Sequence, residues 1–134
     1  YSISANDDLT SKIKEMNENR LADLVIVCTG ALSAAKQALT CVGKGGTILF
    51  FAVPMPDERL EIPINDFWRN EIKIMTSYGA APNDLEESIQ LIASKKLNLH
   101  EMITHKLRFD EIQKGFQLVA EAKDSIKVIV EPNS

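Results

Sequence analysis

The first quarter of the chain contains two different spacings of apolar residues. Apolar side chains recur at helical intervals from Leu9 to Met16, after the possible N-cap residues Asn6 and Asp7, and this pattern predicts an amphipathic helix over residues 8–19. The run Leu24–Cys28 is instead continuous, β-rich and without alternation. Such a run is typical of a strand that is buried on both faces of a parallel sheet.

The next segment predicts a helix followed by a second strand. Ala35, Ala38, Leu39 and Val42 lie at helical spacing, and we expect Gly43, Gly45 and Gly46 to stop this helix before a strand over Thr47–Ala52. The crossover of about twenty residues is long enough to hold a helix against a sheet face. The two strands should therefore be parallel, with a right-handed connection.

The rest of the chain continues this alternation of helices and strands. A third main strand is predicted over Ile72–Ser77, and a helix from Asn83 to about Ser94 with a capping-box variant at Asn83 and Glu86. The other predictions are a short half-exposed edge strand or extended loop over Leu60–Ile64, a strand over Met102–Leu107, a helix with Ile112, Phe116, Val119 and Ala120 on one face, and a closing strand over Ile126–Val130. This order predicts an α/β fold, which by itself indicates no function.

Composition and charge narrow the classes of function. The chain has 134 residues, 45% of them hydrophobic and 25% charged, with a net charge of −4 and no basic run, so a nucleic-acid partner is not expected. No apolar run reaches the length of a membrane span, and the start lacks a signal-peptide pattern, which together predict a cytosolic protein with no membrane partner. Cys28 and Cys41 are expected to be reduced and mostly buried. The two histidines, His100 and His105, have no partner at a metal-ligand interval, so no metal site is expected in this chain.

Five short strings in a fixed order carry a resemblance that covers nearly the whole chain. They are Ala22–Gly30, Gly45–Thr47, Ala52–Pro54, Ile103–His105 and Ser125–Lys127. Together they resemble the carboxy-terminal part of medium-chain, zinc-type dehydrogenases, in the branch that contains alcohol, sorbitol and threonine dehydrogenases.

The resemblance implies an organisation in two parts. Residues 1–94 would form the second half of a Rossmann-type parallel sheet with flanking helices, and residues 95–134 a carboxy-terminal strand-helix-strand segment that packs on a catalytic domain outside this chain. The glycine cluster Gly43–Gly46 precedes a strand, whereas a G-x-G-x-x-G phosphate loop follows one, so it is not that fingerprint. The phosphate loop, the ribose-binding acidic residue and the zinc ligands would lie upstream of Tyr1, and the abrupt start suggests a fragment.

The resemblance also implies a set of cofactor-binding residues at the carboxyl ends of the strands, where ligands of open parallel sheets lie. For each residue a structural role explains the same letters: a strand-to-helix turn, a buried strand entering a proline turn, or a solvent-facing lysine on an alternating strand. The implied residues are Thr29, Gly30 and Ala31, then Phe51, Ala52 and Val53, then Met75 and Thr76, and finally Lys127, which would pair with the cofactor pyrophosphate.

The implied parent activity is reversible NAD- or NADP-dependent oxidation of a small alcohol or polyol at a zinc ion, with this chain inactive alone. Thr76-Ser77-Tyr78 stands where the polyol branch often has Phe-Arg-Tyr, and losing that arginine argues against sorbitol-like specificity. A zinc-independent quinone or enoyl reductase of the same superfamily is one alternative. A non-catalytic dimerisation module is another, because the edge strand Ile72–Ser77 would pair with its twin in a homodimer.

Overall fold

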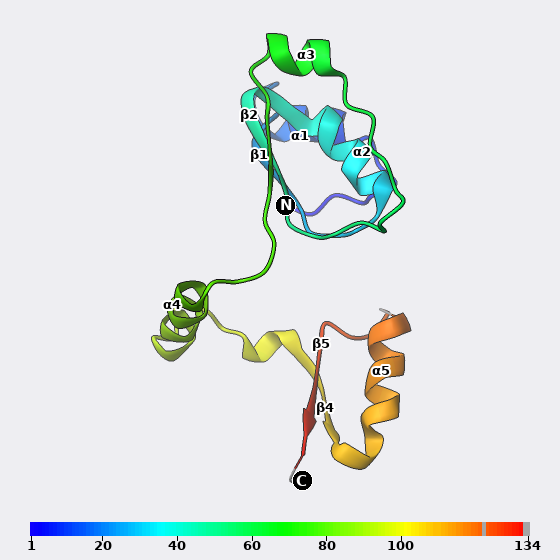
Figure 1. The fold of residues 1–134 in the computed structure, drawn as a ribbon, viewed down its shortest axis with the longest axis vertical. Coiled ribbons are helices and arrows are strands. Elements are labelled where there is room, and N and C mark those ends of the chain that lie inside the picture. Colours follow the sequence, from blue (N-terminus) through cyan, green and yellow to red (C-terminus); the bar gives the residue numbers. More distant parts are fainter. Residues whose placement is uncertain (122, 133–134) are drawn as a thin grey trace. The chain divides into compact units, whose positions relative to one another are not determined.

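The computed structural model describes residues 1–121 and 123–132, and the chain divides into two compact units, residues 1–79 and 80–134. Parallel strands with flanking helices confirm the predicted α/β class. The first unit contains helices α1 (Leu9–Met16), α2 (Leu32–Cys41) and α3 (Ile64–Arg69) and strands β1 (Ala22–Val27), β2 (Val42–Phe50) and β3 (Lys73–Thr76) (Figure 1). The second contains α4 (Pro82–Ala93), β4 (Ile103–Arg108), α5 (Ile112–Glu121) and β5 (Lys127–Glu131), with short 3₁₀ turns at His100–Met102 and Phe109–Glu111.

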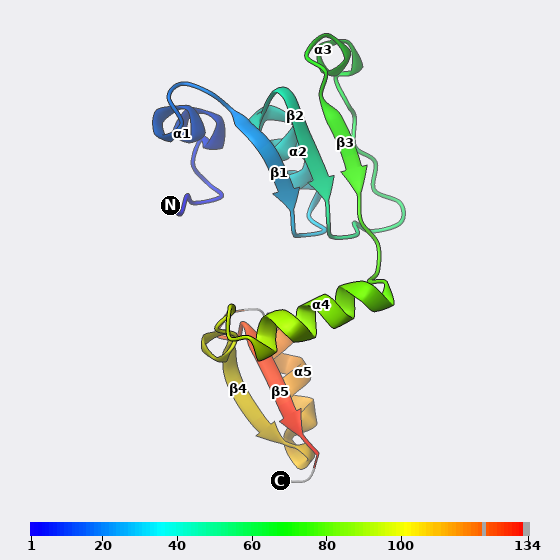
Figure 2. The same cartoon turned by 90° about the vertical axis from the view of Figure 1, so that its left-hand side faces the viewer.

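The three strands of the first unit form one parallel sheet in the order β1-β2-β3. Figure 2 shows β2 between its two neighbours, with all three strands running the same way. Val27 of β1 lies opposite Phe50 of β2, which in turn lies opposite Thr76 of β3. The carboxyl ends of the strands are therefore level with one another.

The glycine cluster lies inside β2 and not in a helix stop. Helix α2 ends at Cys41 and the strand begins directly at Val42, so the predicted glycine stop is wrong. Between the pairs Ala22↔Val42 and Leu24↔Thr47 the register shifts, which leaves residues 43–46 as a bulge in β2. Gly45 has φ +72° there, a conformation that glycine adopts at no steric cost.

The core of the first unit lies on one face of this sheet. The core cluster consists of Val27, Ala38, Val42, Ile48 and Phe67, and Ile48 is fully buried. Helix α2 and Phe67 of α3 supply the cover on this face. The predicted loop or edge strand over Leu60–Ile64 is a loop, and α3 begins at its last residue.

The opposite face of the sheet stays open. Leu24 and Ile26 of β1 are 55% and 51% exposed, so the prediction that this strand is buried on both faces is wrong for the described residues. Cys28, just past the strand, is exposed, while Cys41 is buried; both are free thiols. Burial was predicted for both cysteines and is confirmed only for Cys41, because Cys28 follows the open side of β1.

The second unit is a parallel β4-β5 pair joined by α5. Gly115 is the buried residue of this helix, and a Cβ built on it would lie 3.3 Å from Leu107 and 3.6 Å from Val128. The glycine thus lets the helix approach the sheet closely. The predicted apolar face of α5 points elsewhere, since Phe116 on it is 72% exposed.

Helix α4 confirms the predicted helix in this region and ends at Ala93. Its start differs in detail, because the Asp84 carboxylate accepts a 2.8 Å hydrogen bond from the Ala81 amide, and the predicted Asn83 and Glu86 pair does not make the cap. Its apolar side chains Leu85, Ile89 and Ile92 are exposed. Among the described residues, no helix combines the length and apolar character needed to cross a membrane.

Candidate functional site

The strand ends of the first unit bring together most of the residues that the sequence singled out. The turn Thr29–Ala31 follows β1, the turn Phe51–Val53 follows β2, and Met75 and Thr76 close β3. Because the register sets these three strand ends level, the three groups lie side by side at one edge of the sheet. This is the edge at which ligands of open parallel sheets lie.

The turn after β1 is held by its own polar groups and by a close backbone approach. The Ala31 amide donates to the Thr29 hydroxyl oxygen at 3.3 Å, and α2 begins directly afterwards with Ala31 as its N-cap. A Cβ on Gly30 would lie 2.6 Å from the carbonyl oxygen of Val53. Glycine is therefore required here by the neighbouring turn, whatever else it contacts, while the Thr29 hydroxyl keeps a proton that it can donate.

The backbone links the three strand ends to one another. The amides of Phe51 and Ala52 both donate to the carbonyl oxygen of Val27, each at 3.1 Å, and the Ser77 amide donates to the Phe50 carbonyl oxygen at 3.1 Å. The side chains of Phe51 and Val53 are exposed, as is that of Met75. Main-chain hydrogen bonds thus connect the three strand ends, and the exposed side chains beside them are apolar.

A cavity of about 300 Å³ lies at these strand ends, on the side of the sheet that α2 covers. Its walls are mainly apolar, and the hydroxyl-bearing residues among them are Thr29 and Thr76. Of the predicted residues, Thr29, Gly30, Ala31, Ala52 and Thr76 line the cavity, whereas Phe51, Val53 and Met75 are not among its lining residues.

The loop between β2 and α3 supplies a wall that the sequence did not identify. Glu58, Leu60 and Ile62 line the cavity from this loop. The alternation of Leu60 and Ile62 is the available signal, and it predicts a short edge strand or an extended loop. An ionised Glu58 accepts hydrogen bonds and repels phosphate, so the lining favours a ring or a sugar hydroxyl over a phosphate group.

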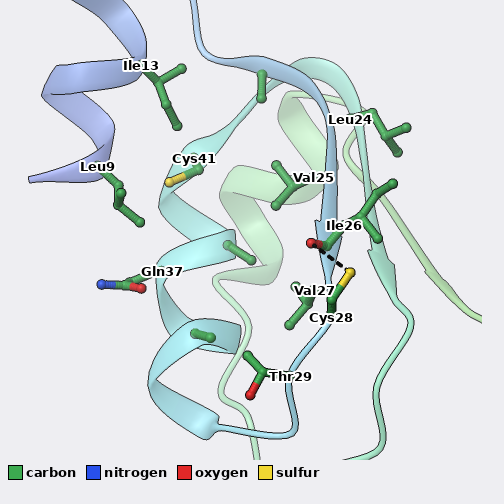
Figure 3. A pocket seen from close by; sticks show the side chains of 13 residues that line it. Leu9, Ile13, Leu24, Val25, Ile26, Val27, Cys28, Thr29, Gln37 and Cys41 are labelled. Carbon is green, nitrogen blue, oxygen red and sulfur yellow. Dashed lines mark hydrogen bonds between the residues drawn. The ribbon is translucent and has the colours of Figure 1, made fainter. Parts of the chain in front are cut away.

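A second, apolar hollow of about 380 Å³ lies beside β1 and is a different feature. Figure 3 shows Leu24, Ile26 and Cys28 on one side of the strand and Val25 and Val27 on the other. Leu9 and Ile13 of α1 and Cys41 of α2 form the far wall. Of the predicted cofactor residues, Thr29 alone lines this hollow.

Lys127 belongs to the second unit and not to the sheet of the first. It opens β5, is exposed and lies opposite Ile103 of β4. The Thr104 hydroxyl donates to the Lys127 carbonyl oxygen at 3.2 Å and accepts from the Ile126 amide at 3.1 Å. The ammonium group is therefore solvent-accessible, while the backbone that carries it is hydrogen-bonded by a side chain of β4.

Within the described part of the chain, the titratable groups with shifted pKa values lie away from the strand ends. Hydrogen bonds from the hydroxyl and amide of Ser11 lower the pKa of Asp8, the N-cap of α1. The Arg108 amide, and then Lys114, lower the pKa of Glu111. The carboxylate of Glu15 raises the pKa of Lys12. These shifts come from hydrogen bonds at helix starts and within a surface ion pair. Over residues 1–121 and 123–132, no three His, Cys, Asp or Glu side chains converge as metal ligands.

Sequence comparison finds relatives over almost the whole chain. A family model described as zinc-binding dehydrogenase matches residues 1–94. A sorbitol dehydrogenase of Halalkalibacterium halodurans is 27% identical over 136 residues, which cover 98% of this chain and 38% of that protein. A D-xylulose reductase of Saccharomyces cerevisiae is 30% identical over 122 residues, which cover 90% of this chain and 34% of that protein. The chain thus spans little more than a third of these relatives' length.

Solved structures match the fold. A putative zinc-binding dehydrogenase from Clostridium scindens superposes with a TM-score of 0.84 at 20% identity, over 97% of this chain and 36% of that one. An oxidoreductase/dehydrogenase of unknown specificity from Escherichia coli superposes with a TM-score of 0.78 at 26% identity, over 96% of this chain and 37% of that one. The arrangement of strands and helices is therefore that of one part of a longer dehydrogenase chain.

Proposed function

This chain belongs to the zinc-binding dehydrogenase family, and we propose that it supplies part of the nicotinamide-dinucleotide site of an NAD- or NADP-dependent alcohol or polyol dehydrogenase. The observation that carries the proposal is the cavity of about 300 Å³ at the level carboxyl ends of β1, β2 and β3. A parallel sheet binds its ligand at this position. The apolar walls with hydroxyls at Thr29 and Thr76 fit a nicotinamide ring and its ribose.

Each proposed residue has a role that its chemistry allows. Thr29 donates its hydroxyl proton to a cofactor oxygen, and the backbone of Gly30 and Ala31 borders the same space. The backbone of Phe51–Val53, with that of Met75 and Thr76, recognises the nicotinamide carboxamide. Lys127 contributes a positive point charge for the pyrophosphate.

The remaining chemistry lies in the complete dehydrogenase. A zinc ion bound there would polarise the oxygen of a small alcohol or polyol substrate, and a nicotinamide cofactor would supply the hydride acceptor. We place the zinc ligands outside these 134 residues, so the chain alone is inactive. We also propose that residues 1–94 belong to the dinucleotide-binding domain and residues 95–134 to a segment that packs on the catalytic domain, in a cytoplasmic enzyme.

Cofactor affinity tests the assignment of Lys127. In the complete protein, Lys127→Ala should weaken NADH or NADPH binding, measured by fluorescence titration, by about 1 to 3 kcal/mol, because a charge-assisted contact is lost. Lys106→Ala is the matched control, since it removes the same charge from an exposed lysine on the neighbouring strand β4. Equal affinities in the wild type and in Lys127→Ala would contradict this part of the proposal.

We propose further that β3 pairs with its twin from a second copy in a homodimer. The strand lies at the edge of the sheet, and all of its residues are exposed, including the apolar side chain of Met75. Unpaired backbone groups on such an edge favour pairing with another strand. A two-fold axis would place equivalent strands side by side.

Sedimentation of the complete protein tests the dimer. Met75→Lys should shift the population towards monomer, because two lysines would face each other across the two-fold axis, a charge arrangement that blocks edge pairing. Met55→Lys, in the exposed loop after β2, is the control and should leave the dimer unchanged. A wild-type protein that sediments as a monomer at high concentration would exclude this interface.

A further inference from the structure

The entry into β5 is organised by a bulge in the neighbouring strand. Ile103 lies opposite Lys127 and His105 lies opposite Val128, so Thr104 is an extra residue of β4 with no partner in the register. A bulge of this kind changes the direction of a nearby side chain and is frequent next to functional sites. In this chain it lies beside Lys127.

The hydroxyl of Thr104 takes over the contacts that a regular ladder would make. It accepts a hydrogen bond from the Ile126 amide at 3.1 Å and donates its single proton to the Lys127 carbonyl oxygen at 3.2 Å. The His105 ring also lies within reach, with its Nδ1 atom 3.0 Å from the Thr104 hydroxyl oxygen. With the hydroxyl proton directed to Lys127, His105 Nδ1 is the donor in that third contact. One hydroxyl thus holds both ends of a two-residue backbone segment, from the amide of Ile126 to the carbonyl group of Lys127.

A second side chain holds the same segment from the other side. The Ser125 hydroxyl donates to the Leu118 carbonyl oxygen in α5 at 2.9 Å, in a half-buried position. Ser125, Ile126 and Lys127 are therefore held between α5 and β4 just where β5 begins. Ordinary packing does not require a hydroxyl at position 104, because the residue is exposed and a valine of the same shape would suit a strand.

We propose that Thr104 is a positioning residue, whose hydroxyl sets the backbone of Lys127 so that its ammonium group meets an anionic oxygen of the cofactor. The inference rests on the proposed function, in which Lys127 contacts the pyrophosphate. A lysine has a long side chain with four rotatable bonds, so each part of its backbone that is held in advance lowers the entropy lost on binding. Thr104 acts on cofactor affinity through Lys127 and does not contact the cofactor.

A double-mutant cycle in the complete protein tests this role, with NADH as the titrated probe. Thr104→Val should raise the dissociation constant roughly three- to tenfold, as expected for the loss of hydrogen bonds at a solvated site. Thr104→Ser keeps the hydroxyl and should restore the wild-type value. In a Lys127→Met background, Thr104→Val should have no further effect, because the two residues act as one unit.

The outcomes separate this inference from the proposed function. If Lys127→Met leaves NADH affinity unchanged, the assignment of Lys127 fails and Thr104 loses its role with it. If Lys127→Met weakens binding while Thr104→Val does not, the positioning role alone is overturned. The positioning role is also overturned if Thr104→Val weakens NADH binding equally with and without Lys127. It is likewise overturned if Thr104→Val lowers the melting temperature without changing NADH affinity, because the loss of a purely structural contact would have that effect.

Discussion

Both faces of the three-stranded sheet carry apolar side chains, but one face is covered and the other is exposed. On one face Val27 and Ile48 pack under α2 and Phe67, and Ile48 is 0% exposed. On the other face Leu24 and Ile26 of β1 remain half exposed, and Met75 of β3, which lies in the same row beyond Leu49 of β2, is 56% exposed. The side chains of both faces come from the same strands and alternate along them.

The difference teaches what an apolar pattern reports. A strand such as Leu24–Cys28 is apolar on both sides because both faces are suited to burial, but the pattern does not say which segment covers each face. Contiguous exposed apolar patches are uncommon on monomeric proteins and mark surfaces that become covered. The open face is therefore built like one side of a core, with apolar side chains suited to contact with a further layer.

Helix α5 repeats the same lesson in the second unit. Gly115 packs against Leu107 and Val128, whereas Phe116, its neighbour in the sequence, is exposed. The apolar stripe of Ile112, Phe116 and Val119 is thus free, and the helix approaches its sheet through a glycine instead. Helical spacing identified the helix and its apolar stripe but not the side by which it packs.

The largest effect expected from this comparison is on stability. In the 134-residue chain, Ile48→Ala should lower the free energy of unfolding of the first unit by about 3 kcal/mol, because it leaves a cavity in the core, and Ile48→Val by about 1 kcal/mol. Ile26→Ala removes the same atoms from the open face and should change stability by only about 0.5 kcal/mol. Urea unfolding of the three variants measures the differences.

The reverse result would change the picture of the open face. If Ile26→Ala destabilised the chain as much as Ile48→Ala, the face would be covered in solution and the two faces would be equivalent. If the loss appeared only at high protein concentration, self-association would be the cover, since binding to the folded state adds to its stability.

The fold was largely predictable because its signals are local. The helices α1, α2, α4 and α5 and the strands of both sheets follow from the spacing of apolar residues within each element. The caps predicted at α1, α2 and α4 are wrong in detail, and the N-cap of α1 is Asp8 instead of Asn6 or Asp7. The errors have long-range causes. The glycines over residues 43–46 predict a helix stop, but the bulge that they form depends on pairing with β1, and the sequence of this segment alone does not encode that pairing. The sequence does not predict helix α3, because the helix has only six residues and contributes a single buried side chain, Phe67, to the core.

The candidate site was predictable in outline for the same reason. Strand ends are local features of the sequence, so Thr29, Ala52 and Thr76 can be selected from it. The structure adds that these three residues line one cavity. The wall formed by the loop at Glu58 could not, because it depends on how this loop folds back over the cavity that Thr29 also lines. The hydroxyl of Thr104 was likewise invisible, since its partners lie more than twenty residues away.

The smaller effect concerns Gly30, which lies at the cavity on the covered side of the sheet. Gly30→Ala should destabilise the first unit by about 2 kcal/mol, because the new Cβ would stand 2.6 Å from the Val53 carbonyl oxygen and backbone has to move. Gly43→Ala is the matched control, with its nearest contacts at 3.5 Å, and should be close to neutral. Urea unfolding of the two variants, followed by NADH titration of both in the complete protein, separates fold from binding. A Gly30→Ala variant as stable as the wild type would mean that the turns after β1 and β2 do not approach each other so closely. If that stable variant bound NADH more weakly, glycine at this position would be needed for cofactor binding and not for the fold.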